Sequence, residues 1–180
     1  THFMGGEITW VCLKAGPNAG QYIFKMKVYR DCGGTTFSQT AQTLTAHNYP
    51  LPGSTTPILL NFESIQDISP VGSPGSGNAC FDCATQPFGT TGAVEEYIWE
   101  SDPTTLVGTP PAEGWHFTWG TCCRSSNISN GMADQDWTLR AVMYPYTDPV
   151  TGNVVPADPC FDSSPDFKEL AKTIICTGYP

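Results

Sequence analysis

The sequence contains few charged residues, and basic residues are the scarcest. Charged side chains make up 14% of its 180 residues, against roughly 25% in an average globular domain. The 8 Lys and Arg are scattered among 17 Asp and Glu, which gives a formal net charge of −9. Nucleic acids and anionic lipid surfaces are bound through clustered basic side chains, so we expect neither as a partner.

Long apolar runs are missing as well. The longest, at residues 57–60, is far shorter than a transmembrane helix of about 18 residues or more, so we expect no membrane insertion. No signal peptide begins at Thr1. A cysteine-rich chain with such an opening is typical of a mature secreted protein, so we expect an extracellular or cell-surface location after removal of an export signal. Asn127 begins an N-x-S sequon and is a candidate glycosylation site.

Signatures of common catalytic and metal sites are also missing. The only histidines are His2, His47 and His116, and no two of them have the spacing of a metal-binding pair. The nucleophile motif G-x-S-x-G does not occur in the sequence. We therefore predict no catalytic residue, no metal and no cofactor.

The acidic residues allow two alternative interpretations. Glu95, Glu96 and Glu100 are candidates for the carboxylate pair of a glycoside hydrolase, although the alternation of a strand also explains Glu96 and Glu100 as one solvated face. Two groups of aspartates are candidate calcium ligands, although turn residues beside prolines are the simpler explanation. These groups are Asp134 with Asp136, and Asp158 with Asp162 and Asp166.

Cysteine, in contrast, is abundant. The eight cysteines are Cys12, Cys32, Cys80, Cys83, Cys122, Cys123, Cys160 and Cys176. Their even number and uneven spacing indicate disulfides in an oxidising compartment and leave the pairing open. Zinc is the alternative, because the C-x-x-C motif at Cys80 and the vicinal pair at Cys122 could supply thiolates, but zinc sites usually repeat the C-x-x-C motif. Neighbouring residues of a strand point to opposite faces, so Cys122 and Cys123 should have different partners.

Apolar and polar residues alternate in several segments, which predicts β-strands. The clearest hairpin joins residues 7–14 to residues 21–31 through a turn at 16–20. Further alternating segments are 35–47, 57–68, 94–100, 114–124 and 136–146. No amphipathic helix or internal repeat is evident. We predict one all-β domain over residues 1–180, a disulfide-stapled, immunoglobulin-like antiparallel β-sandwich of seven to nine strands with long Pro/Gly loops.

The five tryptophans raise the question of carbohydrate binding, because indole rings stack on sugar faces. Trp115, Trp119 and Trp137 lie at alternating strand positions, where we expect burial in the core. Trp10 and Trp99 are the candidate ligand-binding aromatics.

Four sequence blocks occur in order along the chain. They are T-H-x-x-G-G-E at Thr1, V-Y-R-D-C at Val28, C-C-R at Cys122, and S-S-P-x-F at Ser163, which is followed by I-C at Ile175. This series resembles the N-terminal module of large secreted surface proteins of Bacteroidota, associated with gliding motility and type IX secretion. The matching residues are Thr1, His2, Gly5, Gly6, Glu7, Val28, Tyr29, Arg30, Asp31, Cys32, Cys122, Cys123, Arg124, Ser163, Ser164, Pro165, Phe167, Ile175 and Cys176. Ser125 stands where Asn is commoner in that family.

The resemblance implies a non-enzymatic, β-rich surface module without catalytic residues. Family members usually continue past the I-C block, whereas this sequence stops at Pro180, so a fragment, a free-standing relative and a processed subunit all stay open. We expect an extracellular structural protein, either a cell-surface adhesive module or the subunit of a self-assembling filament. Residues 1–7 and 170–180 are candidates for strand exchange, which would link copies of the chain head to tail.

Other surface proteins are alternative partners to further copies of the chain. A carbohydrate-binding surface module, with glycans as partners, is the first alternative function. A secreted glycoside hydrolase is the second alternative.

Overall fold

The computed structural model describes residues 3–69, 82–85, 92–122 and 135–166. Within these ranges the chain forms β-strands and no helix, so none of these residues belongs to a helix long and apolar enough to cross a membrane. The strands are β1 (Phe3–Cys12), β2 (Tyr22–Asp31), β3 (Gln42–His47), β4 (Thr55–Asp67), β5 (Val94–Glu100), β6 (Trp115–Thr121), β7 (Trp137–Met143), β8 (Tyr146–Thr147) and β9 (Val154–Val155). The predicted all-β fold is confirmed.

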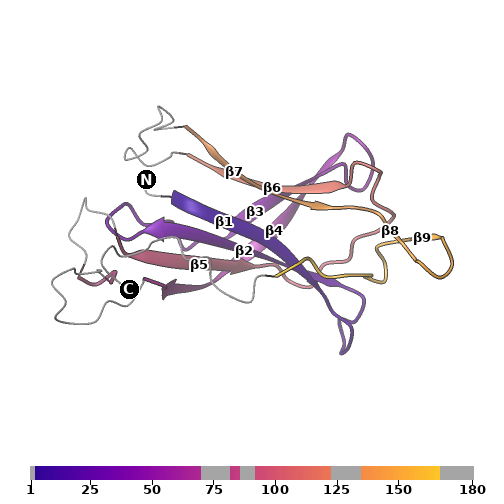
Figure 1. Ribbon diagram of the computed structural model, residues 1–180, viewed down its shortest axis with the longest axis horizontal. Coiled ribbons are helices and arrows are strands. Elements are labelled where there is room, and N and C mark those ends of the chain that lie inside the picture. Colours follow the sequence, from indigo (N-terminus) through magenta and orange to yellow (C-terminus); the bar gives the residue numbers. More distant parts are fainter. Residues whose placement is uncertain (1–2, 70–81, 86–91, 123–134, 167–180) are drawn as a thin grey trace, which may run out of the picture.

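Seven of the strands form one antiparallel sheet in the order β1-β2-β5-β4-β3-β6-β7, and β8 pairs with β9 in a separate hairpin. Strand β4 belongs to both halves of the sheet, because residues 55–60 pair with β3 and residues 61–67 pair with β5. The pairing of the second half with β5 shifts register between Phe62 and Ser64, as at a β-bulge. Bulges of this kind bend a strand. The sheet folds over itself as a sandwich, with β6 and β7 lying over β1 and β2 (Figure 1).

The core lies between the two layers, and aromatic rings fill it. Phe24 of β2 is 0% exposed, and its ring centroid lies 4.6 Å from that of Phe117 in β6. Phe3 at the start of β1 lies 4.7 Å from the ring of Trp137 in β7. Because successive residues of a strand alternate between faces, Lys25 next to Phe24 points away from this core. Burial of these rings is a main source of the stability of the fold.

The edge strands β1 and β7 contact each other through side chains and share no strand ladder. A Cβ atom at Gly6 would lie 2.7 Å from Leu139 Cδ1, which is closer than van der Waals contact, so glycine is needed there. In the segment proposed for strand exchange, residues 3–7 pair with β2 of their own chain. Exchange of these residues would have to break that pairing. Residues 170–180, the other candidate segment, lie outside the described residues.

Two disulfides are fully described, and they join Cys12 to Cys160 and Cys32 to Cys83. Cys122 is disulfide-bonded as well. These bonds confirm the disulfide-stapled fold and indicate an oxidising, extracellular-type environment. The zinc alternative is wrong in the form considered, because two of its four cysteines, Cys83 and Cys122, are in disulfides. Cys80, Cys123 and Cys176 lie outside the described residues.

Candidate functional site

A cluster of two carboxylates, one amine and one phenol lies on the outer face of β1, β2 and β5. Glu7 stands opposite Lys27 in the β1–β2 register, and the Lys27 ammonium nitrogen lies 3.3 Å from Glu7 Oε1. On the other side, Tyr29 stands opposite Glu96 of β5. The Tyr29 hydroxyl donates a hydrogen bond of 3.4 Å to Glu7 Oε1. Cross-strand neighbours of opposite charge stabilise a sheet, so this cluster ties three strands together.

Glu96 is the most buried member of this cluster, at 3% exposure. Among the described residues its Oε2 atom has no hydrogen-bond partner, and the Lys27 ammonium group lies 3.9 Å away. Burial raises the pKa of Tyr29, and the negative charges of Glu7 and Glu96 raise it further. The phenol therefore stays protonated and acts as a donor between the two carboxylates. The expectation that Glu96 belongs to a solvated face is wrong, because the site shields it from water.

Glu95 points to the opposite face of β5 from Glu96, as consecutive strand residues must. It forms an ion pair with Arg30, whose Nε donates a hydrogen bond of 2.6 Å to Glu95 Oε1. Glu100 forms an ion pair with Lys25 at 2.5 Å. The adjacent carboxylates Glu95 and Glu96 thus cannot flank one substrate. Each of the three glutamates considered for glycoside hydrolysis lies close to a basic partner on β2.

Arg30 of the Arg30–Glu95 pair is buried beside a disulfide, and the Glu95 side chain is 13% exposed. Arg30 is 3% exposed, and the Tyr97 hydroxyl donates a second hydrogen bond of 2.8 Å to Glu95 Oε1. Burial and the hydrogen bond to Glu95 raise the pKa of Tyr97 to about 12. A buried carboxylate requires such a cation and such a donor, because removing a charge from water is costly.

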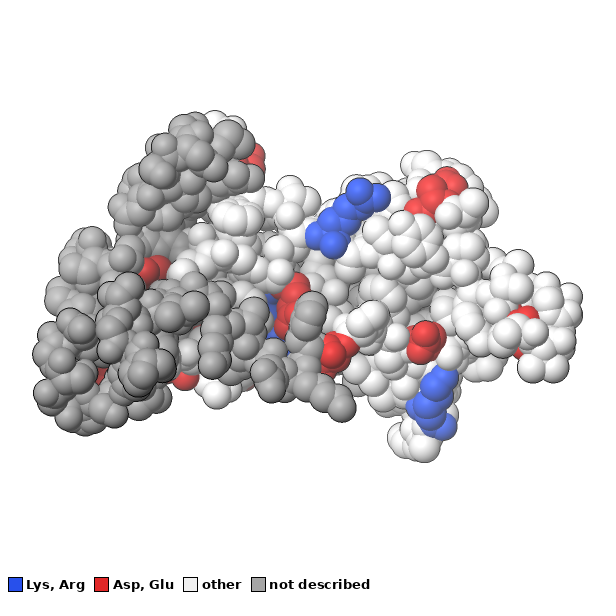
Figure 2. Space-filling view, viewed as in Figure 1, with Lys and Arg blue, Asp and Glu red and all other residues white. Residues whose placement is uncertain are grey.

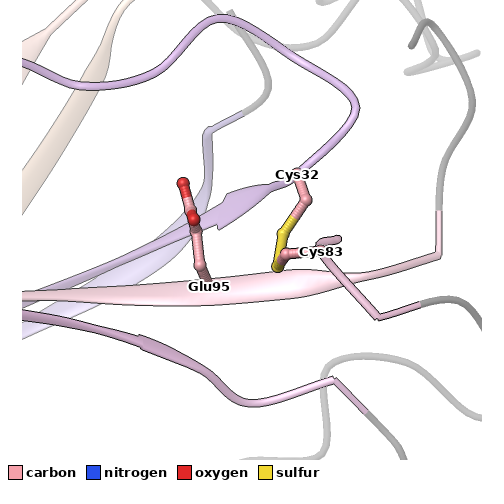
Figure 3. A group of neighbouring side chains, drawn as sticks. All are labelled: Cys32, Cys83 and Glu95. Carbon is pink, nitrogen blue, oxygen red and sulfur yellow. A yellow bond between two sulfur atoms is a disulfide. The ribbon is translucent and has the colours of Figure 1, made fainter. Parts of the chain in front are cut away.

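Glu95 also lies near the sulfurs of Cys32 and Cys83 (Figure 3), with one ligand atom of each residue within 4.8 Å of the others. Metal ions bind thiolates, and both sulfurs here are committed to the disulfide. The Glu95 carboxylate is committed to Arg30. Among the described residues, this is the one group whose ligand atoms lie close enough together to hold a metal ion. Because its sulfurs are bonded to each other and its carboxylate is paired with Arg30, its role is structural.

The candidate aromatic ligands are buried. Trp10 is 7% exposed and Trp99 is 1% exposed, so neither presents an indole face to a sugar, and their assignment to ligand binding is wrong. Trp99 Nε1 donates a hydrogen bond of 3.0 Å to the Thr40 carbonyl, which satisfies its polar atom inside the core. Trp115 and Trp119 are buried as predicted, at 0% and 8% exposure.

Trp137 is partly buried and packs against the same core. Asn127, the candidate glycosylation site, lies outside the described residues, as do His2 and Asp134. Asp162 is exposed and accepts a hydrogen bond of 2.8 Å from the Ser163 amide.

The two remaining histidines, His47 and His116, form one neighbouring pair that the sequence did not suggest. His47 of β3 stands opposite His116 of β6 on the outer face of the sheet. His47 Nε2 lies 2.8 Å from Thr118 Oγ1, and the Arg140 guanidinium lies 3.1 Å from both ring nitrogens of His116. The contact with Thr118 engages the His47 ring and the contact with Arg140 engages the His116 ring, which favours a structural role for both.

The segment 160–164 runs along the free edge of β1, where no strand pairs. The Ser164 amide donates a hydrogen bond of 2.9 Å to the Trp10 carbonyl, and the Trp10 amide donates one of 2.9 Å to Ser164 Oγ. The Cys12 amide donates to Ser163 Oγ at 2.9 Å. The segment therefore lies antiparallel to β1 and covers polar backbone groups that an edge strand leaves exposed.

The Cys12–Cys160 disulfide closes this pairing covalently. Its two Cα atoms lie 5.6 Å apart, although the residues are separated by 148 positions in the sequence. Both side chains are buried, at 5% and 7% exposure. The Lys14 ammonium group donates a hydrogen bond of 2.9 Å to the Phe161 carbonyl and holds the segment on its other side. We call Cys12, Cys160, Ser163 and Ser164 together the clamp.

Sequence reasoning found the clamp residues but not their arrangement. Both cysteines were predicted to form disulfides, and the serines belong to the S-S-P-x-F block, but eight cysteines leave the pairing open. Comparison of the chain with known protein families, curated proteins and solved structures finds no match.

Proposed function

We propose that this chain is a non-enzymatic extracellular structural protein that carries mechanical load at a cell surface, as an adhesive module or as the subunit of a self-assembling filament. The observation that carries this proposal is the Cys12–Cys160 disulfide, which connects the first strand to the segment after the last strand. The resemblance to secreted surface modules implies the non-enzymatic, extracellular part of this proposal.

The clamp supports a load-bearing role because of the path that tension takes. Tension applied to the chain on either side of the sandwich passes along β1 to Cys12, crosses the disulfide, and leaves through the segment after Cys160. Every residue between the two cysteines, a separation of 148 positions, is excluded from this path. Hydrogen bonds between residues such as Trp10 and Ser164 take the load first, and the covalent bond takes it when they break.

The chemistry of the described polar clusters also supports a structural role. The Glu7–Lys27–Glu96 cluster and the Arg30–Glu95 pair connect strands, and their carboxylates are engaged by cations or by phenol donors. The indoles that would serve a carbohydrate-binding module lie in or against the core. These arrangements favour the structural function over the glycan-binding and hydrolase alternatives.

Force spectroscopy tests the proposal. The chain is placed between two marker domains and stretched in its oxidised and reduced forms. A load-bearing clamp predicts that the oxidised chain extends far less than the reduced chain. Equal extension in both forms would contradict the proposal, because the disulfide would then not lie in the path of the load.

A further inference from the structure

The outer face of the layer formed by β3, β6, β7 and residues 55–60 of β4 carries many threonines. Leu44 and Ala46 of β3 are buried, so their neighbours on that strand point outward. The same alternation holds in the other three strands. The outward residues are Thr43, Thr45, His47, Thr55, Pro57, Leu59, His116, Thr118, Gly120, Thr138, Arg140 and Val142. We call this set the threonine array.

The strand registers place members of the threonine array in rows across the sheet. Thr45 of β3 stands opposite Pro57 of β4 on one side and opposite Thr118 of β6 on the other. Thr118 in turn stands opposite Arg140 of β7. Neighbouring strands lie about 4.8 Å apart, so a row over four strands spans about 14 Å. The array thus presents hydroxyl groups in a row that has one guanidinium group at its end.

Arg140 is the permanent positive charge of the threonine array. The other basic residues of the described strands, Lys25, Lys27 and Arg30, each form an ion pair with a glutamate. Arg140 is exposed, and no carboxylate among the described residues forms an ion pair with it. Basic side chains are rare on the face shown in Figure 2, where one basic patch lies over β6 and β7. A guanidinium group without a carboxylate partner keeps donors for an anion.

The two histidines contact the polar groups of the array. His47 Nε2 lies 2.8 Å from Thr118 Oγ1, and the Arg140 guanidinium lies 3.1 Å from the His116 ring nitrogens. His116 Nε2 also lies 2.8 Å from the Glu113 carbonyl oxygen. A carbonyl can only accept, so the imidazole nitrogen is the donor of this bond. Side chains that are ordered before a ligand arrives lose less conformational freedom on binding, which favours their use as contacts.

Two exposed acidic residues border the threonine array. Asp136 precedes Arg140 by four residues, which is about 13 Å in an extended chain. This separation exceeds the Debye length of about 8 Å at physiological ionic strength, so salt screens the charge of Asp136. Glu113 is nearer, because its backbone contacts His116. Of the two, Glu113 is therefore the carboxylate that would oppose an anion bound at Arg140.

We propose that the threonine array binds an acidic polysaccharide, with a carboxylate or sulfate group of the polymer on Arg140 and sugar hydroxyls on Thr118 and Thr45. A guanidinium presents a planar fork of donors that matches such an anion. Threonine hydroxyls both donate and accept hydrogen bonds, as sugar hydroxyls do. Nucleic acid fits poorly, because its phosphates require clustered basic side chains and the array has one.

This inference depends on the proposed function, because it names the class of partner that an adhesive module would hold. The contact is ionic and polar, so it differs from the stacking on indole rings that the burial of Trp10 and Trp99 excludes. It also leaves the clamp free to carry load, because the clamp lies on β1 and the array lies on the other layer.

Isothermal titration of the oxidised full chain with polygalacturonate and with dextran sulfate tests the inference. We expect at least one of them to bind, and to bind more tightly than neutral dextran and than polyglutamate of the same charge. The net charge of −9 repels every polyanion, so tighter binding of the polysaccharide reports a local contact. Absence of binding to both acidic polysaccharides, or equally tight binding of polyglutamate or neutral dextran, would overturn the inference.

Substitution of charged residues then locates the contact. Arg140→Gln should weaken binding by about tenfold or more, because it removes the charge-assisted hydrogen bonds to the anion. Glu113→Gln should strengthen binding, because it removes a repelling charge. The matched control is Lys25→Gln, which removes the same positive charge from the other layer, where Lys25 pairs with Glu100.

The inference is wrong if Arg140→Gln binds the polysaccharide as tightly as the wild type, or if Lys25→Gln weakens binding to the same extent. Circular dichroism and the thermal midpoint check that the variants stay folded, which is the expected result for substitutions at the surface. The force measurement uses no polysaccharide, so failure of this inference and failure of the load-bearing function give different results.

Discussion

Cys12 and Cys160 are 148 positions apart in the sequence, yet their Cα atoms lie 5.6 Å apart and their sulfurs are bonded. The bond closes a loop that contains every strand from β2 to β9. Ser163 and Ser164 extend the contact by pairing with the backbone of β1. The N-terminal strand and the segment after the sandwich are thereby held as one unit.

Removing this bond should destabilise the domain strongly. A Cys12→Ala/Cys160→Ala variant is expected to lose about 5 kcal/mol of unfolding free energy. The disulfide closes a long loop and so lowers the conformational entropy of the unfolded chain, and the variant regains that entropy on unfolding. Chemical denaturation of the variant and of the oxidised wild type measures the difference. A loss below about 1 kcal/mol would show that the loop-closure account does not apply here.

The two described disulfides should differ in their resistance to reduction. Cys12 and Cys160 are buried, whereas Cys32 and Cys83 are partly exposed. A thiolate must reach the sulfur that it attacks, so mild reductant under native conditions should open the Cys32–Cys83 bond first. Alkylation followed by peptide mass spectrometry identifies the thiols in order of release. Earlier release of Cys12 and Cys160 would contradict the burial that we describe.

Removing one member of the Arg30–Glu95 pair should destabilise the fold, whereas replacing both members with apolar residues should destabilise it much less. Glu95→Leu leaves the buried Arg30 charge unpaired and should cost about 3–5 kcal/mol of unfolding free energy, whereas Arg30→Met leaves the partly exposed Glu95 and should cost less. The double variant Arg30→Met/Glu95→Leu removes both charges and should lose much less than the sum of the single losses. Additive losses in the denaturation series would mean that the pair is not coupled.

Alkaline pH should destabilise the fold through its buried phenols. Tyr97 has a pKa of about 12 in the folded protein, above its ordinary value of 10.0. The folded state therefore binds this proton more tightly, so the stabilisation is complete below about pH 10 and is lost as the pH rises towards 12. Burial raises the pKa values of Tyr22 and Tyr29 in the same direction.

Ultraviolet titration of tyrosinate measures this effect. The folded wild type should show a group of phenols that ionise late, and Tyr97→Phe should remove one of them. Ionisation of all tyrosines of the folded chain together, near their ordinary pKa, would contradict the burial of Tyr97 and its hydrogen bond to Glu95.

Much of the fold could be predicted from the alternation of residues along the chain. Residues 94–100 were predicted as a strand, and β5 has those bounds. Strand β3 begins only at Gln42, later than predicted, and β1 begins at Phe3, earlier than predicted. Short strands β8 and β9 were missed because prolines surround them and two residues give no periodic pattern.

The arrangement of the site could not be predicted from the sequence, because it depends on contacts between residues that are far apart in the chain. The disulfide pairing of Cys12 had several candidates, and only the folded sandwich brings Cys160 to it. Glu96 occupies an outward position that alternation predicted to be solvated, and tertiary packing buries it. The burial of Trp99 likewise could not be predicted from its own strand, because it depends on how the opposite layer packs.

The central claim is that the clamp carries load, and stretching single chains between two marker domains tests it most directly. The account predicts that the oxidised chain shows no extension from the residues between Cys12 and Cys160, and that reduction adds about 50 nm of contour length for the 148 positions that the bond spans. A Cys32→Ala/Cys83→Ala variant should keep the short extension. Cys12→Ala/Cys160→Ala should extend further than the wild type without reductant, but by less than the full gain, because the Cys32–Cys83 bond still closes 51 positions. A long extension of the oxidised wild-type chain would contradict the account.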